Sequence, residues 1–208
     1  MSGAGAATER ESRVLDIVTV FVLSITAVLT AWCGFEASKW GGEMSIAFSQ
    51  ASSARIQATS AEGTARDARL YDLQMFTEWV LAEEAGNDDL RLFIEERFTP
   101  EFAVAFDAWQ AGDRSERGPL AMVEYVPPGT DEAQEFAATA DAKFTEALEN
   151  NQRGDNYSLL TVLFALVLFL TAMSQRDVVP WIRRALLGLG IVVGITGIVI
   201  MLTFPIKI

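Results

Sequence analysis

Small residues alternate at spacings of four and three after the first long apolar run, and this pattern constrains the fold most. Seven alanines carry it: Ala47, Ala51, Ala54, Ala58, Ala61, Ala65 and Ala68. Such spacing keeps one side of a helix against one neighbour. The register extends both ways, through Thr19, Leu23, Thr26, Thr30, Cys33, Ala37, Trp40, Met44, Asp72, Met75, Trp79 and Ala82. We call this set the first stripe. At ~1.5 Å per residue, it predicts a rod of roughly 100 Å that begins in a membrane.

Three long apolar runs, at about 17–35, 158–173 and 185–204, stand out in this 208-residue chain. The first and last reach the ~20 residues that cross a bilayer core, and Tyr157 can anchor the shorter middle run at an interface. No charged residue falls inside a run. The first run lacks a signal-peptide cleavage pattern, so we expect it to remain as an anchor.

The fold class predicted is an all-α membrane protein with three transmembrane helices. The first two helices extend into an antiparallel helical extracytoplasmic domain. The expected parts are a cytoplasmic N-terminus (1–12), a first span (13–35), an acidic outer domain (36–155), a second span (156–174), a cytoplasmic loop (175–184) and a third span (185–205). Arginines before the first span and between the other two predict the orientation by the positive-inside rule: Arg10, Arg13, Arg176, Arg183 and Arg184.

The expected outer domain is acidic, with 24 Asp and Glu against 10 Lys and Arg in residues 36–155. This charge argues against nucleic acid as a partner, because phosphates repel it. A solvated surface is one explanation, and attraction of cations or basic partners is another.

Local signals divide the outer domain into helices. The first helix should begin near Glu9 to Arg13, kink at Gly41-Gly42 and end near Gly86. Asp88, Thr99 and Thr130 are expected as caps of the next three helices. A second stripe then runs into the second span: Ala133, Ala137, Ala140, Phe144, Ala147, Asn151, Gly154, Ser158, Thr161, Ala165, Leu168 and Ala172. We expect the two stripes to pack on one another.

Seven residues are candidates for helix packing or for lining a pore: Thr19, Thr26, Thr30, Cys33, Glu36, Gly190 and Gly194. The threonines can line a narrow aqueous path or bond to the preceding turn. Glu36 and Glu43 can pair with Lys39, or form a carboxylate ring at a pore mouth in a symmetric oligomer. Gly190 and Gly194 form a GxxxG contact face. Cys33 is a small packing residue or a site of intermolecular disulfide formation.

The chain has no histidine and only three lysines, which removes the commonest base, metal ligand and triad component. The acidic group Glu83, Glu84, Asp88 and Asp89 matches no calcium-loop spacing. We therefore predict no catalytic, cofactor-binding or metal-binding residues, and no enzyme activity.

Two stretches together carry a resemblance. One is Ala31 to Gly42, with Ala51-Ser52 and Arg55 after it. The other is Asn150 to Tyr157, followed by Leu160 to Phe164. Between them stand Phe98 to Phe102 and Phe106 to Trp109. The chain resembles a family of uncharacterised bacterial three-span membrane proteins with no assigned activity. The resemblance implies a bacterial inner membrane and transfers no site.

The function expected is that of a non-enzymatic integral membrane protein, a scaffold or accessory subunit acting through helix–helix assembly. Its partners would be the lipid bilayer and either further copies of itself or another membrane protein. One alternative is an oligomeric channel or passive pore. Another is a sensor that signals through a separate cytoplasmic partner.

Overall fold

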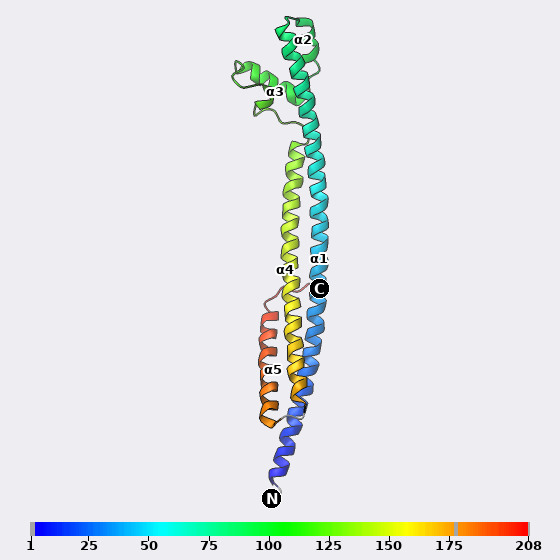
Figure 1. Cartoon of the computed structure of the whole chain (residues 1–208), viewed down its shortest axis with the longest axis vertical. Helices are drawn as coiled ribbons and strands as arrows, with labels where there is room; N and C mark the ends of the chain where they lie inside the picture. The colour runs from blue at the N-terminus through cyan, green and yellow to red at the C-terminus, as the bar shows by residue number, and fades with distance from the viewer. Residues whose placement is uncertain (1–2, 177–178, 208) are drawn as a thin grey trace. The chain divides into compact units, whose positions relative to one another are not determined.

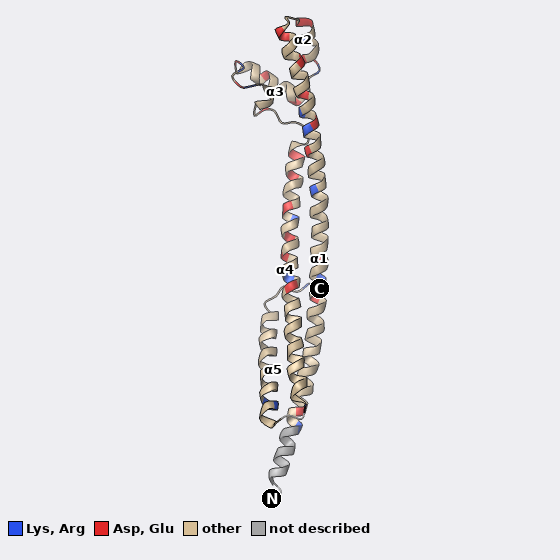
Figure 2. Ribbon diagram, viewed as in Figure 1, with Lys and Arg blue, Asp and Glu red and all other residues tan. Residues whose placement is uncertain are grey.

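The computed structural model describes residues 3–176 and 179–207, with side chains from residue 13 onward. Within these residues the chain is all α-helical, without strands (Figure 1). The helices are α1 (Gly3–Glu84), α2 (Asp88–Glu95), α3 (Pro100–Ala111), α4 (Thr130–Ser174) and α5 (Pro180–Met201), with a 3₁₀ turn, η1 (Pro119–Ala121). Helices α1, α4 and α5 are each long and apolar enough to cross a membrane. Figure 2 shows their apolar stretches almost free of charge.

The chain forms two compact units. Unit 1 comprises residues 1–48 and 145–208, and unit 2 comprises residues 49–144. Helix α1 and helix α4 each contribute to both units, and α5 belongs to unit 1. The domain boundaries predicted at residues 36 and 155 follow hydropathy, whereas the two units divide after residues 48 and 144. The two divisions therefore cut α1 and α4 at different residues.

Helix ends follow local capping chemistry. Helix α1 stops before Gly86, which has a left-handed φ of 66°, and the Asn87 N–H donates to the Ala82 carbonyl at 3.0 Å. Thr99 accepts from the Phe102 N–H, and Pro100 opens α3, as predicted.

Three local predictions were wrong. The cap of α2 is Asn87, whose side chain accepts from the Leu90 N–H, and Asp88 lies in the first turn. Thr130 donates backward to the Pro127 carbonyl instead of capping α4. Helix α1 already begins at Gly3, before the predicted start near Glu9 to Arg13. Its helical hydrogen bonding continues through Gly41-Gly42, so the kink expected there stays a prediction.

Every described member of the first stripe is buried or half-buried. In unit 1, a Cβ at Gly154 of α4 would lie 3.5 Å from the Ala37 carbonyl of α1, so these two backbones approach closely. In unit 2, Arg55 of α1 pairs with Asp141 of α4 at 2.6 Å. The two helices therefore pack side by side within each unit (Figure 1).

The second stripe does not continue into the second span as predicted. Beyond Ala147 the buried face of α4 shifts by one residue, to Asn150, Gly154, Tyr157, Leu160, Phe164, Val167, Thr171 and Ser174. The cause is α5, which packs against α4 through Gly190 and Gly197. Because α4 must bury surface against both α1 and α5, its buried face turns toward larger side chains.

Unit 2 is built around an aromatic core. Its buried members are Trp79, Phe102, Phe106, Trp109 and Tyr125, and Phe76 and Phe98 pack against them. The Trp79 and Phe106 rings meet edge to face with centroids 5.0 Å apart, a favoured aromatic geometry. The α2–α3 segment and the loop after it therefore fold onto α1 through aromatic packing.

Candidate functional site

Glu36 is a buried carboxylate at the end of the first apolar run. Its side chain is 0 % exposed, although glutamate is almost never fully buried without a partner. The Lys207 backbone N–H donates to Glu36 Oε2 at 2.9 Å. Glu36 Oε1 is buried and has no hydrogen-bond partner among the described residues. The carboxylate therefore binds the segment after α5 and does not face water.

The residues after α5, Phe204 to Lys207, lie against α1 and α4, and we call them the tail. The Tyr157 hydroxyl donates to the Pro205 carbonyl at 3.1 Å, and the Phe204 ring meets the Tyr157 ring edge to face. Lys207 Nζ is 3.4 Å from Glu43 Oε1. This last pair replaces the predicted pairing of Glu43 with Lys39, whose Nζ lies over the Phe35 ring at 5.9 Å.

Apolar and aromatic groups surround this carboxylate. The buried cluster beside it consists of Cys33, Trp40, Tyr157, Leu160 and Phe164. Arg153 and Lys207 lie 4.8 and 5.7 Å from the Trp40 ring centroid, within cation–π range. Nearby cations offset part of the cost of burying a carboxylate. The described polar contacts of this site hold the tail: Glu36 with the Lys207 N–H, Glu43 with Lys207 Nζ, and Tyr157 with the Pro205 carbonyl.

The candidate residues of the first span lie on the packed side of α1. Thr19 is fully buried, and its hydroxyl donates to the Leu15 carbonyl at 2.7 Å. Thr30 donates to the Thr26 carbonyl at 2.7 Å. Cys33 is 0 % exposed, and its sulfur lies 3.9 Å from Met201 Sδ of α5. Thr26 is 4 % exposed and contributes to an apolar groove.

Gly190 and Gly194 of α5 face α4. A Cβ at Gly190 would lie 3.2 Å from Thr171 Oγ1, and one at Gly194 would lie 3.6 Å from Val167. Sequence reasoning did not single out Gly197, where a Cβ would come within 2.9 Å of Leu163 and Phe164. The signal was present, because Gly197 follows Gly194 by three residues and so lies on the same face.

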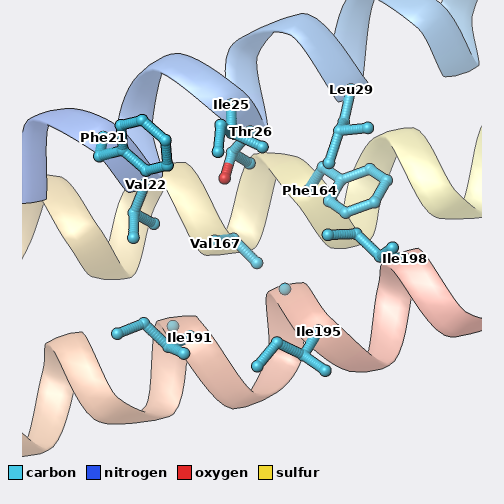
Figure 3. Close-up of a pocket in the computed structure, with 12 residues that line it drawn as sticks. Phe21, Val22, Ile25, Thr26, Leu29, Phe164, Val167, Ile191, Ile195 and Ile198 are labelled. Carbon is cyan, nitrogen blue, oxygen red and sulfur yellow. The ribbon is translucent and has the colours of Figure 1, made fainter. Parts of the chain in front are cut away.

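An elongated groove of about 370 Å³ lies between α1 and α5 in unit 1, with α4 behind it (Figure 3). Its lining is apolar apart from the Thr26 hydroxyl: Phe21, Val22, Ile25, Thr26, Leu29, Phe164, Val167, Gly190, Ile191, Gly194, Ile195 and Ile198. It brings Thr26, Gly190 and Gly194 together. Thr19, Thr30, Cys33 and Glu36 do not line it.

A second buried carboxylate, Asp72, lies in unit 2 on the first stripe. Its two oxygens accept from the Tyr125 hydroxyl at 2.7 Å and the Thr99 hydroxyl at 2.8 Å. Burial raises the pKa of Tyr125 well above its usual value, and the Asp72 carboxylate adds to the shift. Asp72 thus joins α1, the start of α3 and the loop before α4. Sequence reasoning placed Asp72 on the stripe but gave it no partner.

Two members of the acidic group at the end of α1 form ion pairs, Glu83 with Arg114 and Asp88 with Arg91. Both Glu83 oxygens accept from the Arg114 guanidinium, at 2.9 and 3.0 Å. That guanidinium also lies over the Trp79 and Trp109 rings. Across the described part of the chain, no group of three or more cysteine and acidic side chains is arranged to hold a metal ion.

Comparison of the chain with known proteins found no relative. No protein-family model, no curated protein and no solved structure matches the chain.

Proposed function

We propose that this chain is a non-enzymatic integral membrane protein that acts as a scaffold or accessory subunit through helix–helix assembly. The observation that carries the proposal is that α1 and α4 each run without a break from an apolar span into the acidic unit 2. In such a helix each backbone N–H donates to the carbonyl four residues earlier, so the chain passes from a span into unit 2 without a loop. Such helices are suited to hold a folded unit beside a membrane partner.

Arginine placement supports an orientation with the N-terminus in the cytoplasm and unit 2 outside it. Arg13, Arg176, Arg183 and Arg184 gather at one end of the spans, whereas unit 2 is acidic. With the resemblance described above, this favours the inner membrane of a bacterium as the location.

The proposed contact surface for a partner is α2. Three of its eight residues are large, apolar and exposed: Leu90, Leu92 and Phe93, at 42, 53 and 51 %. Unit 2 is acidic and lies outside the apolar spans, so lipid does not cover these side chains. Leu90 and Phe93 are three residues apart and share one side of α2, and adjoining exposed apolar groups mark interaction sites more often than scattered ones do.

The pore alternative draws less support from the geometry. Thr19 and Thr30 donate their hydroxyl hydrogens to carbonyls of their own helix, and Glu36 binds the tail. These polar groups form hydrogen bonds within one chain.

Site-specific photo-cross-linking in intact cells tests the contact surface. A benzophenone residue in place of Leu92 should give one adduct of discrete mass. The same residue in place of Glu135, which is exposed on α4, should not give that adduct. The mass of the purified complex, measured by light scattering and corrected for bound detergent, then shows whether the partner is a second copy. A monomer without any adduct at α2 would contradict the proposal.

Thiol labelling tests the orientation. In a Cys33→Ser background, Glu116→Cys should react with a membrane-impermeant maleimide in whole cells. Arg176→Cys should react only after permeabilisation. Both positions are exposed, so the pair differs in the side of the membrane alone. The reverse pattern would invert the topology.

A further inference from the structure

The groove between α1 and α5 is closed at both ends by contacts between the same two helices. At one end Arg183 of α5 pairs with Asp16 of α1 at 2.5 Å. At the other end Met201 of α5 lies against Cys33 of α1, with 3.9 Å between the sulfurs. Between these contacts the helices separate, and α4 forms the floor (Figure 3).

The dimensions of the groove match one acyl chain. Its lining runs from Phe21 to Leu29 on α1 and from Gly190 to Ile198 on α5. Each stretch corresponds to about 12 Å of helix. One leaflet of the hydrocarbon core is about 15 Å thick, half of the ~30 Å total. A groove of this length therefore accommodates a chain that crosses one leaflet.

A transmembrane helix fits this space less well. With its side chains a helix is about 10–12 Å across, and it packs along the full ~30 Å of the core. Here the lining of the groove covers only about 12 Å of each helix, roughly two helical turns. An acyl chain is narrow and flexible, so it can fill a short, irregular apolar space.

Charge at one end of the groove indicates the headgroup. Exposed arginines lie beyond Phe21 and Gly190, namely Arg13, Arg176 and Arg184. Asp16 lies at the same end and is paired with Arg183. Arg183 Nε is buried and has no hydrogen-bond partner in the described part of the chain. Guanidinium groups bind phosphate oxygens through paired N–H donors.

From these observations we infer that the groove binds one acyl chain of an anionic phospholipid, whose phosphate lies near Arg183 and the exposed arginines beside it. The apolar lining supplies contact surface for the chain, and the arginines select for negative charge. This site requires only that the three spans are inserted in a bilayer, so it does not depend on the scaffold role.

Native mass spectrometry of the full chain in a neutral detergent tests the site. The probes are palmitoyl-oleoyl phosphatidylglycerol and palmitoyl-oleoyl phosphatidylcholine, which have the same chains and different headgroup charge. We expect one phosphatidylglycerol per chain, retained about tenfold more tightly than phosphatidylcholine. Equal retention of the two lipids, or retention of neither, would overturn the inference.

Two pairs of variants locate the bound lipid. Ile195→Trp places a ring in the groove, whereas Val192→Trp places the same ring on the exposed side of α5 outside the groove. Only the first should displace the lipid. Arg176→Gln combined with Arg184→Gln should remove the preference for phosphatidylglycerol, whereas Lys39→Gln, at the other end of the first span, should not.

Two further results would also exclude the site. Equal lipid loss from Ile195→Trp and Val192→Trp would place the lipid elsewhere on the spans. A protein dimer that Ile195→Trp disrupts, without any change in bound lipid, would identify the occupant as a second copy.

Discussion

Gly129 is constrained by both its backbone conformation and its surroundings. Its φ is +90°, and a Cβ there would lie 2.5 Å from the Ala61 carbonyl and 3.2 Å from Thr64. The loop before α4 therefore rests directly on the α1 backbone in unit 2. A glycine is required both by the backbone conformation and by the lack of space.

Gly129→Ala should lower the stability of unit 2 by roughly 1–3 kcal/mol, because it combines an unfavourable φ with a clash. Hydrogen–deuterium exchange of peptides from α3 measures this loss. Gly63→Ala is the control. The nearest group to its added Cβ is the end of the Arg66 side chain at 3.9 Å, and alanine should stabilise that helix interior by about 1 kcal/mol. Equal effects at the two positions would contradict the argument.

Tyr125 makes the stability of unit 2 sensitive to alkaline pH. Its pKa is raised in the folded chain above the value of about 10 expected for an unfolded one. The folded state therefore keeps its proton where the unfolded state loses it. The resulting stability is complete below pH 10 and declines as pH rises toward the folded pKa, by up to about 1.4 kcal/mol per pH unit.

Tyr125→Phe should flatten this decline above pH 10, although the variant is less stable near neutral pH because Asp72 loses a hydrogen bond. For each protein, denaturant unfolding between pH 8 and 11, monitored by exchange of unit 2 peptides, gives the free energy of unfolding. Its slope against pH is then compared between the two proteins. Parallel slopes for the two proteins would show that Tyr125 does not titrate in this range.

At the scale of elements, the tail packs through Phe204 against the buried cluster that contains Cys33, so the reactivity of this thiol reports on its docking. Tyr157→Phe removes the hydroxyl that donates to Pro205. Loss of one such bond costs about 1 kcal/mol. The tail should then open about fivefold more often, and N-ethylmaleimide should label Cys33 about fivefold faster.

Tyr71→Phe is the matched control, since its hydroxyl is exposed in unit 2 and contacts the Arg97 carbonyl at 3.4 Å. It should leave the labelling of Cys33 unchanged. Glu36→Leu should accelerate labelling as Tyr157→Phe does, because it removes the acceptor of the Lys207 N–H. Unchanged labelling in both tail variants would mean that the tail does not protect the thiol.

Helix α5 is held against α4 by glycine, and its third glycine is the tightest. Gly197→Leu should destabilise unit 1 by about 1–3 kcal/mol, because Leu163 and Phe164 leave no room for a larger side chain. Thermal unfolding in detergent measures the loss. Gly188→Leu, where a Cβ meets nothing within 4 Å, should change little. A similar loss at Gly188 would point to helix propensity rather than packing.

Local and distant interactions differ in how far the sequence reveals them. The three apolar helices, the Thr99 cap and the Gly86 ending depend on neighbouring residues, so hydropathy and capping rules predict them. The binding of Lys207 to Glu36 joins residues 171 positions apart, and the Tyr125–Asp72 bond joins residues 53 apart. No local pattern encodes such partners. The face of α4 inside the span was mispredicted for the same reason, because its burial depends on α5.

At the scale of the whole molecule, charge and hydrophobicity are divided between the units. Residues 49–144 hold 19 Asp and Glu against 8 Lys and Arg, whereas the spans carry almost no charge. Net charge far from zero keeps a unit soluble but weakens it through self-repulsion. Unit 2 should therefore respond to salt, and unit 1 should not.

Raising the NaCl concentration from 10 to 500 mM reduces the screening length from about 30 Å to below 8 Å. Exchange of unit 2 peptides should slow over this range, while exchange of peptides from α5 stays constant. Glu78→Gln combined with Glu124→Gln, at two exposed acids, should reduce the salt response. A salt effect of equal size in both units would indicate a general effect on hydration.

The groove between α1 and α5 has a kinetic consequence. Contacts at both ends hold the two helices together, and α4 closes the back. With the spans inserted in a bilayer as proposed, the open side faces the hydrocarbon. An occupant must then enter and leave by lateral diffusion in the plane of the membrane. Its exchange rate would follow the composition of the surrounding leaflet, and water-soluble competitors would not affect it.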